Sequence, residues 1–94
     1  MNYTFHLFSG NWCPMCLVAL PEIMSTFTEL KIDKNNINFY DVNAFKTEPK
    51  EYLLKFKIKR VPTLVVLDEN NNEVGRITEY YNKSWREDIK EILS

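Results

Sequence analysis

Residues 12–16 read Trp12-Cys13-Pro14-Met15-Cys16 and contain both cysteines of the 94-residue chain. If a helix begins at Pro14, the two thiols lie one helical turn apart. Unpaired N–H groups and the positive end of the helix dipole favour the thiolate form of a cysteine at such a place. Pro14 fits the first turn, because an N–H there has no partner within the helix. This pattern predicts a nucleophilic Cys13 and a more buried, less ionised Cys16, which attacks the mixed disulfide formed at Cys13.

The segments around this motif have the pattern of a βαβ unit. Residues 3–8 are aromatic and apolar enough for a strand, which ends in a turn at residues 9–11. Residues 37–42 have the composition of a mostly buried strand. From Pro14 to about Lys34, apolar residues recur at helical spacing and predict a helix with one buried stripe: Leu17, Leu20, Ile23, Met24, Phe27 and Leu30.

The next segments predict a short helix followed by a hairpin. A helix is expected over residues 48–57, with Pro49 in its first turn and an apolar face made by Tyr52, Leu53 and Phe56. Residues 63–67 and 73–80 are rich in β-formers and flank a polar turn, which indicates two antiparallel strands.

The chain is expected to end in a helix. Ser84 and Glu87 fit a capping box, and the apolar residues Trp85, Ile89 and Ile92 follow at helical spacing. The element order β-α-β-α-β-β-α then predicts an α/β fold, a mixed four-stranded sheet with helices on both faces. Five aromatic residues fall on core-facing positions: Phe5, Phe27, Phe39, Phe56 and Trp85.

Length and charge exclude several classes of protein. A chain of 94 residues that is 45% hydrophobic fits one domain over residues 1–94, which we expect to be monomeric. With 12 basic and 13 acidic residues, the chain lacks the excess of positive charge that is typical of nucleic-acid binders. The longest apolar run, residues 63–67, is too short to span a membrane. Residues 1–6 have no leader pattern, so we expect a cytoplasmic protein.

A metal site fits the cysteine pair poorly. A structural zinc needs four ligands, whereas this chain offers Cys13, Cys16 and one histidine, His6, without a second cysteine pair. Redox chemistry is the favoured interpretation, and inert thiols remain the alternative. His6 is expected to point to the face of its strand opposite to its neighbour Leu7.

Three features together resemble the thioredoxin superfamily. Residues 12–16 look like its W-C-x-x-C motif, and Pro21 looks like the proline that kinks the helix after that motif. Val61-Pro62-Thr63 is similar to the loop that carries the family's cis proline. The resemblance covers nearly the whole chain and implies a thioredoxin-like fold with a cis bond before Pro62.

The resemblance also implies what the site does. It implies a thiol-disulfide oxidoreductase that reduces disulfides of protein substrates, with Cys13 and Cys16 catalytic and no bound cofactor or metal. A flavoprotein of the thioredoxin-reductase type or glutathione would supply electrons. The residues expected to contact the substrate are Trp12, Pro14, Met15, Val61 and Pro62.

The sequence departs from the thioredoxin pattern at several positions. Pro14 in the Cys-Pro-x-Cys motif is typical of glutaredoxins, although the Gly-Gly segment of glutaredoxins is missing. Leu7 stands where thioredoxins have a buried acid, and Tyr80 or Tyr81 stands where they have a glycine beside the substrate groove. Two alternatives therefore stay open: a glutathione-dependent glutaredoxin-like enzyme, and an interaction module with unused cysteines.

Overall fold

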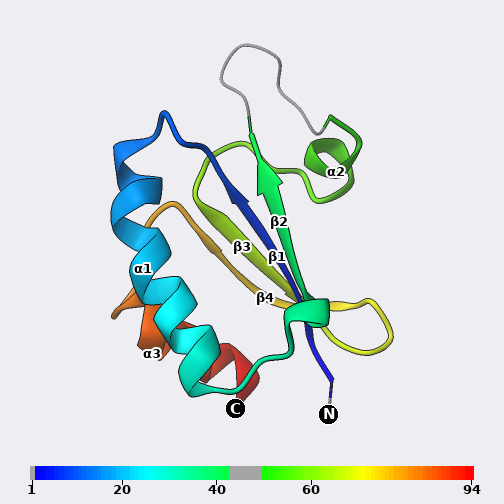
Figure 1. The fold of residues 1–94 in the computed structure, drawn as a ribbon. Helices are drawn as coiled ribbons and strands as arrows, with labels where there is room; N and C mark the ends of the chain where they lie inside the picture. The colour runs from blue at the N-terminus through cyan, green and yellow to red at the C-terminus, as the bar shows by residue number, and fades with distance from the viewer. Residues whose placement is uncertain (1, 43–49) are drawn as a thin grey trace.

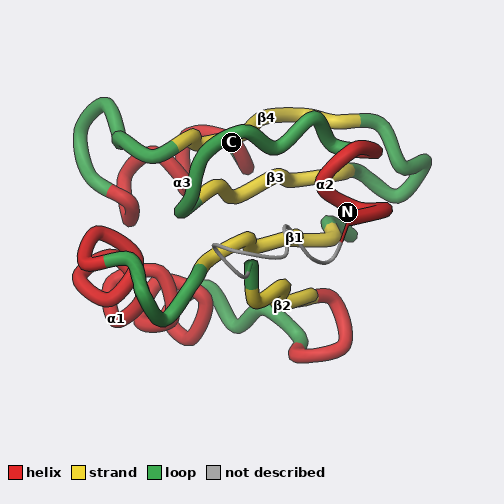
Figure 2. Tube along the Cα trace, turned by 90° about the horizontal axis from the view of Figure 1, so that it is seen from above, coloured by secondary structure: helices red, strands yellow, loops and turns green. Residues whose placement is uncertain are grey.

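The strands form one mixed sheet in the computed structural model, which describes residues 2–42 and 50–94 (Figure 1). The strands are β1 (Thr4–Ser9), β2 (Ile37–Asp41), β3 (Thr63–Leu67) and β4 (Glu73–Thr78), in the order β2-β1-β3-β4 (Figure 2). β1 and β2 are parallel, whereas the β1–β3 and β3–β4 pairs are antiparallel. The predicted mixed four-stranded sheet is thus confirmed within the described residues.

Helices cover both faces of this sheet. α1 (Pro14–Glu29) and α3 (Trp85–Leu93) lie on one face, and α2 (Lys50–Lys55) lies on the other (Figure 1). A short 3-10 helix, Lys34–Asn36, leads into β2. No helix among the residues described is both long enough and apolar enough to cross a membrane.

The alternation of side chains along β1 creates two cores. Phe5 and Leu7 point into the core under α1 and α3, which they share with Ile23, Phe27 and Ile89. Phe8 points the other way and packs with Phe56, Val65 and Leu67 beside α2. Each large apolar side chain buried in this way contributes about 1.5–3 kcal/mol. The two-sided burial fixes β1 in the middle of the molecule, directly before the cysteine motif.

α1 ends earlier than the apolar pattern predicted. The helix stops at Glu29 rather than near Lys34, because Lys31 adopts a left-handed conformation with φ 56°. The Lys31 N–H then bonds to the Thr28 carbonyl, and the Ile32 N–H bonds to the Phe27 carbonyl. These two bonds satisfy the last carbonyls of the helix in a Schellman motif.

Four residues predicted to face the core are exposed instead, and one of them is Tyr52 on α2, with 39% of its surface exposed. Leu17 and Met24 lie on the outer side of α1, whose buried stripe consists of Cys16, Ala19, Ile23, Thr26 and Phe27. Phe39 pairs in register with Leu7, yet 53% of its surface is exposed because β2 is an edge strand. The prediction of a mostly buried strand over residues 37–42 was therefore wrong.

The other predicted elements agree more closely. α2 ends at Lys55, two residues before its predicted end at Lys57, which has a left-handed conformation. Its predicted start at residue 48 lies outside the described residues. The hairpin is present, although β4 ends at Thr78. Ser84 caps α3 by accepting the Glu87 N–H at 2.9 Å, as predicted. Trp85 and Ile89 are buried.

An ion-pair cluster joins α1 to α3 and gives a first prediction. Hydrogen bonds from Arg86 and then Lys90 lower the pKa of Glu29 from 4.5 to about 2. Because the folded state favours the carboxylate, its contribution to stability is present above about pH 4.5 and is lost as pH falls towards 2. We expect Glu29→Gln to be less stable than the native protein at pH 7, with the difference shrinking towards pH 2 in urea unfolding.

The matched control is Glu51→Gln, the same change of charge on α2. A stability difference for Glu29→Gln that is the same at pH 7 and pH 2.5 would contradict the assignment of the cluster.

Candidate functional site

Cys13 is the residue at which α1 begins. It is the N-cap, with an extended backbone, and its Sγ accepts the backbone N–H of Cys16 at 3.3 Å. Pro14 occupies the first helical turn, and the turn before it is closed by a bond from the Cys13 N–H to the Gly10 carbonyl at 3.1 Å. An N–H donor and the positive end of the helix dipole therefore both lie at this sulfur, and each stabilises a thiolate.

Cys16 lies one turn further along α1 and is held as a thiol. Both cysteines are free and buried, with 6% of Cys13 and 3% of Cys16 exposed. Burial raises the pKa of Cys16 to about 12, and the hydrogen bond and charge of Cys13 add to this effect. Cys16 therefore keeps its proton at neutral pH while the pair is reduced.

The loop before β3 lies against the first cysteine. The peptide bond between Val61 and Pro62 is cis, as the resemblance implied. The Cys13 thiol donates to the Val61 carbonyl, with 3.8 Å between sulfur and oxygen. The Pro62 carbonyl accepts the Glu79 N–H at 2.7 Å, which ties the loop to the end of β4. Val61 and Pro62 are thus brought to the cysteine motif from the other half of the chain.

Trp12 is both anchored and exposed. Its Nε1 donates to the Val42 carbonyl at 2.7 Å, while 49% of its surface remains exposed beside Cys13. Gly10 makes this position available, because a Cβ there would lie 2.8 Å from Trp12 Cε2 and 2.9 Å from the Val42 oxygen. From the sequence, Gly10 was predicted only as part of a turn. Its position just before the cysteine motif was the one feature of the sequence that could have indicated its role beside Trp12.

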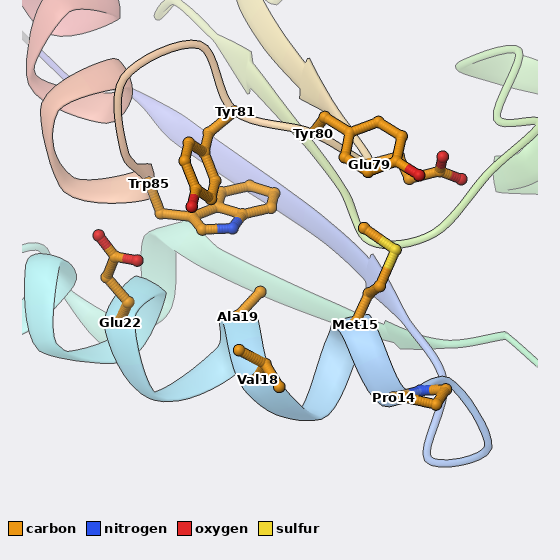
Figure 3. Close-up of a pocket in the computed structure, with 9 residues that line it drawn as sticks. All are labelled: Pro14, Met15, Val18, Ala19, Glu22, Glu79, Tyr80, Tyr81 and Trp85. Carbon is orange, nitrogen blue, oxygen red and sulfur yellow. The ribbon is translucent and has the colours of Figure 1, made fainter.

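A groove runs from the cysteine motif along α1 (Figure 3). Its volume is about 310 Å³, and we call it the tyrosine groove after the two tyrosines in its lining: Pro14, Met15, Val18, Ala19, Glu22, Glu79, Tyr80, Tyr81 and Trp85. Met15 extends from α1 towards Tyr80 and Glu79, and Tyr81 lies near the Trp85 ring (Figure 3). Tyr80 and Tyr81 thus form part of the wall of a cavity.

Two neighbouring residues of β1, His6 and Leu7, lie on opposite faces of the sheet. Leu7 is fully buried in the core under α1. His6 points to the opposite face, as predicted, where its Nδ1 lies 2.8 Å from the Tyr40 hydroxyl. Burial, and secondly the charge of Lys55, lowers the pKa of His6. A second cavity of about 210 Å³ reaches Cys16 from the side of Asn11 and Asp41, and is wide enough for water.

The contact between Gly10 and Trp12 generates a second prediction. Gly10→Ala should push the indole away from the Val42 carbonyl, because the added methyl group overlaps both. We expect the indole N–H of Trp12 to lose its protection against hydrogen exchange in NMR spectra. The free energy of unfolding should fall by about 1–3 kcal/mol. Asn11→Ala, at the exposed neighbouring position, should change neither. An unchanged indole resonance in Gly10→Ala would refute the contact.

Comparison with known proteins agrees with this geometry. The thioredoxin family (Thioredoxin) matches the chain over residues 5–93. A curated relative is the rice "Thioredoxin-like protein HCF164, chloroplastic" (Oryza sativa subsp. japonica), 26% identical over 70 residues, which are 74% of this chain and 26% of that protein. This chain thus spans about a quarter of that relative's length.

Solved structures show the same architecture. Thioredoxin 1 of the thermophilic eubacterium Thermosipho africanus is 27% identical, with a TM-score of 0.70 over 96% of this chain and 93% of that chain. A protein described as DsbH oxidoreductase shares the fold, with 16% identity and a TM-score of 0.72 over 98% of this chain and 72% of that one. The cis-proline loop, the cysteine pair at the start of α1 and the match over residues 5–93 lead to one conclusion: the chain belongs to the thioredoxin family.

Proposed function

We propose that this chain is a thiol-disulfide oxidoreductase that reduces disulfides of protein substrates, with Cys13 as nucleophile and Cys16 as resolving thiol. The observation that carries the proposal is the hydrogen bond from the Cys16 N–H to Cys13 Sγ at the start of α1. The position of the Val61 carbonyl 3.8 Å from the same sulfur supports it. The relatives named as thioredoxins support the same activity at the level of the family.

The proposed reaction has two exchange steps. The Cys13 thiolate attacks one sulfur of the substrate disulfide, and the other sulfur leaves as a thiolate that takes up a proton. Cys16 then loses its proton and attacks Cys13 Sγ, which releases the second substrate sulfur and joins Cys13 to Cys16. The substrate gains two electrons, and the cysteine pair becomes a disulfide.

The surroundings of Cys16 support this order of steps. In the reduced chain, burial and Cys13 together raise the pKa of Cys16 to about 12. Once Cys13 is bonded to a substrate sulfur, it no longer carries a charge or shares the proton of the Cys16 thiol. Burial is then the remaining cause that raises the pKa of Cys16. Water in the cavity beside Asn11 and Asp41 can accept the proton, since Leu7 provides no carboxylate.

The residues around Cys13 are proposed to hold the substrate chain. Trp12 and Met15 offer exposed apolar surface on either side of the sulfur, and Pro14 is exposed between them. Val61 lies beside the sulfur through its carbonyl, and the buried Pro62 follows it in the same loop. An extended peptide that crosses Cys13 would contact both groups.

The electron donor is proposed to be a flavoprotein of the thioredoxin-reductase type. The Cys-Pro-x-Cys motif with Pro14 at the first turn favours glutathione as a second candidate. Turnover sustained by glutathione alone would select the second candidate. We further propose that the chain acts in the cytoplasm, because the reaction starts from the dithiol that reducing compartments maintain. We also propose that it acts as a monomer with one domain. Cell fractionation and sedimentation equilibrium test these two points.

A third prediction follows from the assigned roles of the two cysteines. Cys13→Ser should reduce protein disulfides at the background rate, because no nucleophile starts the exchange. Cys16→Ser should accumulate a covalent adduct with substrate that a reducing gel releases, because no thiol resolves it. The measurement is insulin reduction together with mass spectrometry of the adducts.

Ser25→Ala, at an exposed position of α1 outside the cysteine motif and the groove, is the control and should retain turnover close to that of the native chain. Activity that persists in Cys13→Ser would refute the assignment. Normal partner binding by a double Cys→Ser variant, together with an inactive native chain, would establish the interaction module instead.

A further inference from the structure

The walls of the tyrosine groove are apolar and exposed. Val18 on α1 is 79% exposed, and Tyr80 on the facing segment is 70% exposed. Met15 lies at the end of the groove nearest to Cys13 (Figure 3). A cavity of about 310 Å³ is large enough for one or two apolar side chains of a bound peptide.

The charged residues of the groove are both acidic. Glu79 is paired with Arg60, whose Nη1 lies 3.3 Å from its carboxylate. Glu22 accepts the backbone N–H of Arg86 at 3.2 Å, and no ion pair of the described residues gives it a cation. Glu22, at the end of the groove far from Cys13, is held by the first turn of α3 and has no ion-pair partner among the described residues, none of whose basic side chains lines the cavity (Figure 3). This end is complementary to a positively charged side chain.

The distance from Cys13 to Glu22 determines how far apart the reacting cysteine and the cationic side chain of a bound peptide should be. The two residues are nine positions apart in sequence, which corresponds to about 13.5 Å along a helix. An extended peptide covers that distance in about four residues, at ~3.3 Å per residue. The aliphatic stem of a lysine or arginine can lie along Val18 while its charge reaches Glu22.

We propose that the tyrosine groove selects disulfide substrates in which an apolar residue adjoins the target cysteine and a lysine or arginine lies about four residues away. The inference rests on the proposed function and names the class of substrate that this chain prefers. Met15, Val18 and Tyr81 contact the apolar part, and Glu22 recognises the cation.

Synthetic peptides test the charge preference directly. Each peptide carries one cysteine as a mixed disulfide with thiopyridine, a leucine beside it, and lysine, glutamine or glutamate four residues away, on either side. Stopped-flow release of thiopyridine measures the rate constant with the reduced chain. We expect the lysine peptide to react about three- to tenfold faster than the glutamate peptide in at least one orientation. The ratio should shrink as salt is added.

Two variants of equal net charge identify the residue responsible. Glu22→Gln keeps an oxygen that can accept the Arg86 N–H but removes the charge, so the lysine-to-glutamate ratio should approach one. Glu51→Gln, on the opposite face of the sheet, should retain the ratio of the native chain.

The outcomes separate this inference from the function on which it rests. Equal rates with all peptides in the native chain, or an unchanged ratio in Glu22→Gln, would overturn the inference. If the native chain nevertheless reduces dipyridyl disulfide, which has no peptide and no charge, the proposed function stands. If it reduces neither reagent, both are overturned.

Discussion

The hydrogen bond from the Cys16 N–H to the sulfur of Cys13 is the interaction on which the site depends. It makes a cysteine side chain the cap of α1, a role that oxygen-bearing side chains usually have. The start of α1 then places Cys16 on the buried side of the helix and leaves Pro14 and Met15 on the exposed side. One local bond thus fixes the two buried thiols one turn apart, with Cys13 at the cap of α1 and Cys16 on the inner side of the helix.

The rest of the fold holds this helix start in place. β1 is buried on both sides and ends directly before Gly10, where the missing side chain makes room for the Trp12 indole. The Val61–Pro62 loop is fixed by the fully buried strand β3 that follows it and by the bond between the Pro62 carbonyl and the Glu79 N–H. Leu7 adds an apolar side chain to the core under α1, and the proposed route for the proton of Cys16 is the cavity beside Asp41, which Cys16 lines.

Much of the fold and the cysteine motif could be predicted because local patterns determine them. Residues 63–67 were predicted with the bounds that β3 has, because Pro62 and Asp68 delimit a short run of β-forming residues. The end of α1 could not be predicted, because Lys31 adopts a left-handed conformation that glycine or asparagine would have indicated. The exposure of Phe39 also escaped the pattern, since periodicity does not distinguish an edge strand from a central one. The tyrosine groove depends on residues that are far apart in sequence and meet only in the fold.

The reduction midpoint of Cys13 and Cys16 tests whether the two thiols form the proposed redox-active pair. The protein would be equilibrated in graded glutathione buffers, and the fraction of free thiols would be read from the mass added by alkylation. We expect a reversible two-electron transition between dithiol and intramolecular disulfide, at a potential more reducing than the glutathione couple. The absence of any reversible transition would contradict the proposed pair, because thiols that do not exchange cannot carry the proposed reaction.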